Sequence, residues 1–296
     1  MNKLLLPLIL LAAWLIFGSL YLRNRFCGAT PAAAPAVITA PTSTNRLLIE
    51  DGTSFKTAAA EHFDFSSTNF NYQTPLGTGV DASLQQTATY LTDNPNRSLM
   101  ITGLYKESEG NESVFPTLGV ARANEVKKAF IELGVSGKQL LTNDKRLPES
   151  SELNGGILES GVDFSFTETT MDISERLAAI KARFDANPVT IYFPTGEQIV
   201  ALTPEQKQDF TDLVFYLDNV KGSRLEVGGH TDNKGELKIN TRLSRKRAEF
   251  VRDYLTGSGL DRRRLTAKGY GPDAPIDSND TKAGRAKNRL VEVLLR

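Results

Sequence analysis

The stretch from Gly228 to Phe250 constrains the fold most, because it contains an amphipathic helix with a charged residue inside its apolar face. Residues 224–227 before it alternate polar and apolar side chains, which predicts a half-buried strand that ends at a glycine pair. A polar loop follows, and the helix is expected from about Asn240 to Tyr254. The charged residue, Arg247, lies four residues from both Leu243 and Val251.

A guanidinium in an apolar face needs a partner, because burying an unpaired charge costs several kcal/mol. The nearest acidic candidate is Asp232 at the strand exit, fifteen residues before Arg247. Two interpretations follow. The two charges could form a structural ion pair that fixes the loop to the helix. Alternatively, they could lie side by side in a cleft, where the carboxylate binds an ammonium and the guanidinium binds a carboxylate in bidentate fashion.

Several ordered motifs between Val189 and Arg296 closely resemble the OmpA-like C-terminal domain: GGHTDNKG, Asn240, LSRKRA at 243–248 and TKAGRAKNRLVEV at 281–293. That family consists of periplasmic modules that bind peptidoglycan. The resemblance implies that Asp232 and Arg247 hold the amino and carboxyl groups of diaminopimelate in the peptide stem. One departure is visible, since the family usually has N-R-R-V where this chain has Asn288-Arg289-Leu290-Val291.

The resemblance also implies that Thr231, Asn240 and Leu243 border the ligand. Asn240 could instead cap its helix. Arg285 is a further candidate for the cleft, with hydrogen bonding within the last loop as the alternative. For Asn288 we favour the loop-fixing role.

Composition excludes several classes of function. Acidic and basic residues balance to a formal net charge of zero, so bulk electrostatics imply no nucleic acid and no anionic membrane surface as partner. One cysteine and two histidines cannot assemble a zinc cluster. His230 and Asp232 have no visible third ligand or nucleophile nearby in sequence. We therefore expect no enzyme activity, no metal and no cofactor.

Residues Leu4–Leu22 form an almost unbroken apolar run without a charge, which suits one membrane crossing of about 20 residues. A cleaved signal peptide is the alternative, but Arg23 and Arg25 stand where a small-residue cleavage site should begin. The residues before Cys27 lack the small-residue box needed for lipid attachment, so we expect a free thiol or an interchain disulfide there. An Ala/Pro/Thr-rich spacer follows.

Residues 47–168 repeat the second half of the chain in outline. The segment SLMITG at 98–103 parallels the strand before the glycine pair, and the helix from Leu118 again carries an arginine, Arg122, in its apolar stripe. Counting forward from the strand glycine aligns Asp232 with Lys106, whereas counting back from Arg122 reaches Glu107. The acidic signature is therefore lost or displaced, and we expect a structural or protein-contact role for this copy.

These observations predict an α+β chain of two βαβαβ(α)β modules, each with helices on one face of a mixed sheet, after an N-terminal transmembrane helix. The expected domains are a membrane anchor at 1–26, a spacer at 27–46, a divergent module at 47–168, a connector helix at 169–187 and a peptidoglycan-binding module at 188–296. We call residues 47–168 the first module and residues 188–296 the second module.

The expected function is a non-enzymatic tether between a membrane and the cell wall, with the globular part in the periplasm. Its expected partners are diaminopimelate-containing peptidoglycan and the membrane, and further envelope proteins or a second copy of the chain are possible partners. The sequence does not distinguish the inner from the outer membrane. The alternative is a structural interaction protein of the cell envelope in which wall binding is vestigial.

Overall fold

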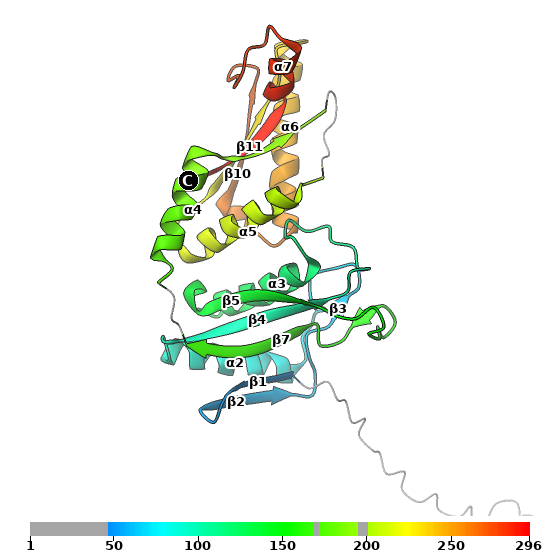
Figure 1. The fold of residues 1–296 in the computed structure, drawn as a ribbon, viewed down its shortest axis with the longest axis vertical. Helices are drawn as coiled ribbons and strands as arrows, with labels where there is room; N and C mark the ends of the chain where they lie inside the picture. Colours follow the sequence, from blue (N-terminus) through cyan, green and yellow to red (C-terminus); the bar gives the residue numbers. More distant parts are fainter. Residues whose placement is uncertain (1–46, 169–171, 195–200) are drawn as a thin grey trace, which may run out of the picture. The chain divides into compact units, whose positions relative to one another are not determined.

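The computed structural model describes residues 47–168, 172–194 and 201–296 (Figure 1). The predicted anchor, Cys27 and the predicted spacer lie outside these residues. Within the described part of the chain, no helix combines the length and the apolar character that a membrane crossing requires. The described residues form one compact unit.

The second module is built on a four-stranded mixed sheet, which confirms the predicted α+β class. The strand order is β10-β9-β11-β8, with β10 parallel to β9, and β11 antiparallel to both of its neighbours. The four strands are β8 (Val189–Tyr192), β9 (Leu225–His230), β10 (Leu265–Gly271) and β11 (Leu290–Leu295). The 3₁₀ turn η2 (Arg262–Arg264) leads into β10.

Three helices complete the second module: α5 (Pro204–Asn219), α6 (Leu237–Gly257) and α7 (Lys282–Asn288). The sequence at the start of α5 predicts a capping box, and the structure contains it. Gln206 N donates to Thr203 Oγ1 at 3.3 Å, and Thr203 N donates to Gln206 Oε1 at 2.8 Å. Helix α6 extends three residues beyond the expected helix at each end.

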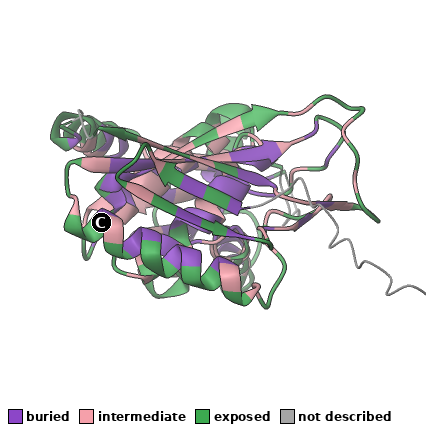
Figure 2. Cartoon of the chain, turned by 90° about the horizontal axis from the view of Figure 1, so that it is seen from below, coloured by how far each residue is buried: buried purple, intermediate pink, exposed green. Residues whose placement is uncertain are grey.

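The core of the second module lies on one face of its sheet, and buried residues alternate with more exposed ones along β8 and most of β11. Figure 2 shows the distribution of buried and exposed residues along the chain. Helices α5 and α6 cover that face of the sheet. The buried residues that they and the strands share include Val189, Ile191, Phe210, Leu213, Leu217, Val227, Ala248, Val251, Leu255, Val291 and Val293. The opposite face carries polar groups, such as Glu226 with its ion partners Lys268 and Arg296.

In the first module, β5-β4-β7 form a three-stranded sheet, with β4 parallel to β5 and antiparallel to β7. It departs from the expected layout: among the described residues, β1 pairs with β2 and β3 with β6, and no strand before α2 joins the main sheet. Its elements are β1 (Leu47–Asp51), β2 (Phe55–Ala59), β3 (Phe65–Ser66), α2 (Thr78–Asp93), β4 (Arg97–Tyr105), α3 (Leu118–Glu132), η1 (Gly137–Gln139), β5 (Leu140–Arg146), β6 (Ile157–Leu158) and β7 (Val162–Glu168).

Helix α4 (Ser174–Ala186) lies in the segment predicted as a connector. It packs against α5 and β11, and its Ile180 and Phe184 are buried in the same core cluster as the second module. It therefore serves as a structural part of that core as well as a link along the chain.

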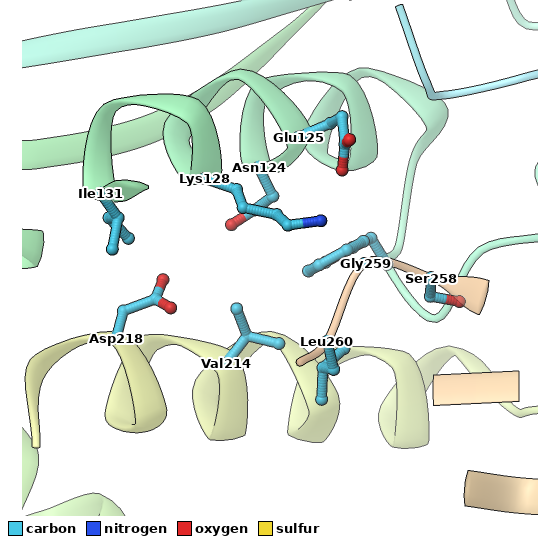
Figure 3. A pocket seen from close by; sticks show the side chains of 10 residues that line it. Asn124, Glu125, Lys128, Ile131, Val214, Asp218, Ser258, Gly259 and Leu260 are labelled. Carbon is cyan, nitrogen blue, oxygen red and sulfur yellow. The ribbon is translucent and has the colours of Figure 1, made fainter. Parts of the chain in front are cut away.

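The loop before α3 contacts the end of α6. Val114 N donates to Ser258 Oγ at 3.2 Å, and the Tyr254 hydroxyl donates to Ser113 O at 3.3 Å. Between α3 and α5, Lys127 forms an ion pair with Asp218 at 2.8 Å. These helices and the turn after α6 line a small pocket of about 50 Å³, into which Glu125 points (Figure 3).

Candidate functional site

The backbones of β9 and α6 approach each other very closely near the start of the loop that connects them. A Cβ added to Gly229 would lie 2.0 Å from the backbone oxygen of Ser244 in α6, so only glycine fits there. Because the end of β9 and the first turns of α6 are pressed together, the side chains of the connecting loop and of α6 are held at one end of the sheet.

These side chains surround a pocket of about 410 Å³, a volume within the range of small-molecule sites. All six residues that the sequence analysis proposed as ligand contacts line it, together with three basic residues that it did not propose. The nine are Thr231, Asp232, Lys234, Asn240, Leu243, Arg247, Lys282, Arg285 and Arg289. Five of them are cationic and one is anionic.

Arg247 is fully buried, as expected for its place on the apolar face of α6. Its Nη2 donates to Pro194 O at 3.2 Å, and the guanidinium carbon lies 4.9 Å from the centre of the Phe193 ring, a cation–π contact. Burial lowers the pKa of Arg247, and the neighbouring charge of Arg289 lowers it further, whereas the charge of Asp232 raises it. The charge of Asp232 therefore acts on the Arg247 guanidinium, but less strongly than burial and the charge of Arg289 do.

The direct ion pair of Asp232, however, is with Arg289. Arg289 Nη1 donates to Asp232 Oδ2 at 3.0 Å, and Lys234 N donates to Asp232 Oδ1 at 3.0 Å. The interpretation in which Asp232 and Arg247 form a structural ion pair is thus not what the described residues show. The structural ion pair at this place joins the loop to the start of β11.

Asn240, Arg285 and Asn288 all hold loops by hydrogen bonds to backbone groups. Asn240 Nδ2 donates to Lys234 O at 2.9 Å and to Asp232 O at 3.3 Å, so it fixes the loop from inside α6, whose N-cap is Glu236. The helix-capping alternative for Asn240 is therefore wrong. Arg285 Nη1 donates to the carbonyl oxygens of residues 279 and 280 at 2.7 and 2.9 Å while it lines the pocket.

Asn288 takes the loop-fixing role that we favoured. Its Oδ1 accepts hydrogen bonds from the backbone N–H groups of residues 276 and 277, each at 2.9 Å. Its Nδ2 donates to Asp277 O at 2.8 Å. Asn288 is fully buried and does not line the pocket.

Two pocket-lining polar atoms are buried without a hydrogen-bond partner among the described residues: Thr231 Oγ1 and Arg289 Nε. Such atoms cost about 1–3 kcal/mol each when nothing satisfies them.

Sequence reasoning missed Lys234, Lys282 and Arg289. Lys234 and Lys282 lie within the quoted motifs, but single lysines in polar loops are not informative by themselves. Arg289 reaches Asp232 because β11 pairs antiparallel with β9 in the sheet, a non-local relation. The signal that could have revealed it was its position directly before the last strand, inside the motif that carries the family resemblance.

His230 has a structural role beside the pocket. Its ring stacks on Tyr270 with centroids 5.1 Å apart, and its two ring nitrogens lie 3.0 Å from Ala274 O and 3.2 Å from Glu292 Oε1. Among the described residues, no group of three or more histidine, cysteine or acidic side chains is placed to hold a metal ion.

Comparison with known proteins identifies this region. Residues 192–289 match the model of the OmpA family. They form an OmpA family domain. The OmpA domain contains the whole pocket described above, from Thr231 after β9 to Arg289 before β11.

Two relatives illustrate the extent of the similarity. The chain is 37% identical over 94 residues to the probable lipoprotein YiaD of Escherichia coli (strain K12), which covers 32% of this chain and 43% of the relative. It is 36% identical over 100 residues to the peptidoglycan-binding protein ArfA of Mycobacterium bovis, which covers 34% of this chain and 31% of the relative. The chain thus spans less than half the length of either relative.

Among solved structures, the peptidoglycan-associated lipoprotein from Burkholderia pseudomallei is 23% identical, with a TM-score of 0.34, over 38% of this chain and 92% of that one. The cell wall anchor of the T6SS from Pseudomonas aeruginosa is 30% identical, with a TM-score of 0.31, over 40% of this chain and 94% of that one.

Proposed function

We propose that this chain is a non-enzymatic protein of the cell envelope that binds peptidoglycan through the OmpA domain and tethers a membrane to the cell wall. The observation that carries the proposal is the convergence of Asp232, Arg247 and the other expected contacts on one pocket. A relative similar over the same domain is named as a peptidoglycan-binding protein, which supports the same conclusion.

In this proposal the free zwitterionic end of diaminopimelate is the ligand. Asp232 binds its ammonium group. An ionised carboxylate has about four lone-pair sites, and the hydrogen bonds from Lys234 N and Arg289 use two of them. The remaining capacity of Asp232 is available to an ammonium, and the ion pair with Arg289 holds the carboxylate in place.

Arg247 binds the carboxylate of the same ligand end. Its guanidinium is held by the carbonyl oxygen of Pro194 and by the ring of Phe193, so its orientation is set before a ligand arrives. The low-dielectric surroundings that lower its pKa also strengthen its attraction for an anion.

The surplus of cations favours a ligand with more carboxylates than ammonium groups. Lys234, Lys282 and Arg285 surround the pocket in addition to Arg247 and Arg289, whereas Asp232 is its one acidic lining residue. A peptide stem with further free carboxylates fits this balance better than an isolated zwitterion does.

The membrane tether rests on the apolar run at Leu4–Leu22. We propose that this run anchors the chain and that the Ala/Pro/Thr-rich spacer carries the globular part into the periplasm. No step of the proposal requires catalysis or a cofactor.

The test is sedimentation of the full chain with purified peptidoglycan that contains diaminopimelate, with free diaminopimelate as competitor. We expect binding that the competitor reverses, and loss of binding in Arg247→Lys, because lysine cannot form the bidentate fork. The matched control is Arg264→Lys, an arginine of the same module that donates to the backbone carbonyls of Leu217 and Ser223 away from the pocket. Wall binding by Arg247→Lys equal to that of the control would reject the assigned role of Arg247. Absence of wall binding by the unaltered chain would favour the alternative of vestigial wall binding.

A further inference from the structure

The first module contains a buried ion pair that the proposed function does not use. Arg122 is fully buried, and the side chain of Glu109 is 2% exposed. Arg122 Nη2 donates to Glu109 Oε1 at 2.7 Å and Nη1 donates to Oε2 at 3.2 Å, the bidentate arrangement of a guanidinium with a carboxylate. Glu109 is not the acid that sequence counting proposed, since Glu107 forms an exposed ion pair with Arg146.

The guanidinium of Arg122 is held in the same way as that of Arg247. It lies over the ring of Phe65 at 5.1 Å, and its Nη2 donates at 3.0 Å to the carbonyl oxygen of the next residue, Ser66. In the OmpA domain, Arg247 lies over Phe193 at 4.9 Å, and its Nη2 donates at 3.2 Å to the carbonyl oxygen of the residue after Phe193.

The strand beneath each arginine also makes the same close approach. A Cβ added to Gly103 in β4 would lie 1.9 Å from the backbone oxygen of Gly119, three residues before Arg122. The corresponding distance from Gly229 to the oxygen of Ser244, three residues before Arg247, is 2.0 Å. Both glycines lie on a central strand flanked by one parallel and one antiparallel neighbour (Figure 1).

We propose that the first module holds a second copy of the carboxylate-binding site, and that the side chain of Glu109 occupies it in place of a ligand carboxylate. This inference rests on the proposed function only where it assigns a ligand carboxylate to Arg247. The chain would then offer one open pocket to the wall, and the first module would be closed to ligands by its own residue.

The loop around Glu109 holds the carboxylate in position. Lys106 N donates to Glu109 Oε2 at 2.6 Å, and Glu109 N donates to Lys106 O at 3.1 Å, so the acid is bonded to its own turn as well as to the arginine. The carbonyl oxygen of Leu104 accepts a further hydrogen bond from Arg122 Nη1 at 2.7 Å. With these contacts the occupant is preorganised and cannot be displaced without opening the loop.

The experiment removes the Glu109 carboxylate by substitution and supplies a carboxylate again from solution. Glu109→Ala deletes a methylene and a carboxylate, which together match acetate. In the full chain we expect the melting temperature of the first module to fall by about 10 °C, because one partner of a buried ion pair is lost. Acetate, at the same ionic strength as a chloride reference, should restore at least half of that fall.

Two controls define the result. Acetate should not shift the melting temperature of the wild-type chain, whose site is filled, nor that of Glu109→Ala/Arg122→Met, which has no guanidinium. Equal melting temperatures of Glu109→Ala in acetate and in chloride would overturn the proposal.

A second measurement uses only the wild-type chain, so it does not depend on whether a variant folds. Titration of the wild-type full chain with a diaminopimelate-containing stem peptide should give one bound peptide per chain, and two would overturn the proposal of a filled first site. No binding at all would refute the proposed function of the OmpA domain, in which case acetate rescue still decides whether Glu109 occupies a carboxylate site.

Discussion

Replacement of Asp232 by asparagine isolates the charge that the proposed function assigns to the ligand ammonium. Asparagine has the same shape as aspartate, and its Oδ1 can still accept the hydrogen bond from Lys234 N. The loop should therefore keep its conformation. The carboxylate charge is lost, and with it the charged partner of Arg289.

The expected effect on binding is larger than the effect on stability. A hydrogen bond to a charged group contributes about 1.5–3 kcal/mol, which corresponds to roughly ten- to hundred-fold weaker binding of the ammonium-bearing ligand. The ion pair with Arg289 is partly screened, since the two side chains are 20% and 14% exposed. Its loss should cost about 1 kcal/mol of unfolding free energy.

The assay is calorimetric titration with two stem peptides that differ only in the free amino group of diaminopimelate, which is acetylated in one of them. The wild-type chain should bind the free amine more tightly, and Asp232→Asn should bind both peptides with similar affinity, because acetylation removes the group that Asp232 would contact. The matched control is Glu226→Gln, which removes a comparable ion-paired acid of the same sheet outside the pocket. A variant that still prefers the free amine as strongly as the wild type would refute the assigned role of Asp232.

Two further predictions concern stability. Burial raises the pKa of Glu125, so the folded state binds a proton more tightly than the unfolded state does. The resulting stability is fully present below the ordinary carboxyl pKa of 4.5 and is lost as the pH rises through the raised pKa of the folded state. Glu125→Gln should therefore raise the denaturation midpoint at pH 7 and leave it nearly unchanged at pH 4, and a pH-independent difference would contradict this account. Gly229→Ala should lower the free energy of unfolding, measured by chemical denaturation, by about 2–3 kcal/mol, because the added Cβ would meet the backbone oxygen of Ser244. Gly257→Ala at the end of α6 has open space around its Cβ, so it should leave the free energy of unfolding unchanged or raise it slightly.

The sequence predicted the elements that are set by local patterns. The capping box at Thr203 and Gln206 and the alternation along β9 depend on residues close together in the chain, and both are present. The burial of Arg247 also followed from helical spacing alone, because a residue four positions from two apolar neighbours shares their face.

The partners of the buried charges could not be predicted in the same way. Asp232 pairs with Arg289 because two strands distant in sequence lie side by side, and no spacing along the chain records that pairing. Arg122 pairs with Glu109 because the loop between β4 and α3 turns back at Lys106, whereas counting residues pointed to Lys106 or to Glu107. The conformation of a loop determines which of its side chains reaches a given point. Counting residues along the chain therefore predicts a contact reliably only within a regular helix or strand.

Two arginines lie in one setting but beside different loops, which explains why the setting itself does not define the function. Phe65 and Phe193 support their guanidinium groups alike, and a backbone carbonyl holds each fork. What differs is the facing loop: in the first module, the chain places Glu109 against Arg122 from a loop that is itself hydrogen-bonded to that acid. In the OmpA domain the corresponding loop instead directs Asp232 toward Arg289, beside a pocket of about 410 Å³. The choice between a filled and an open site therefore depends on a few loop residues, while strand, helix and arginine stay the same.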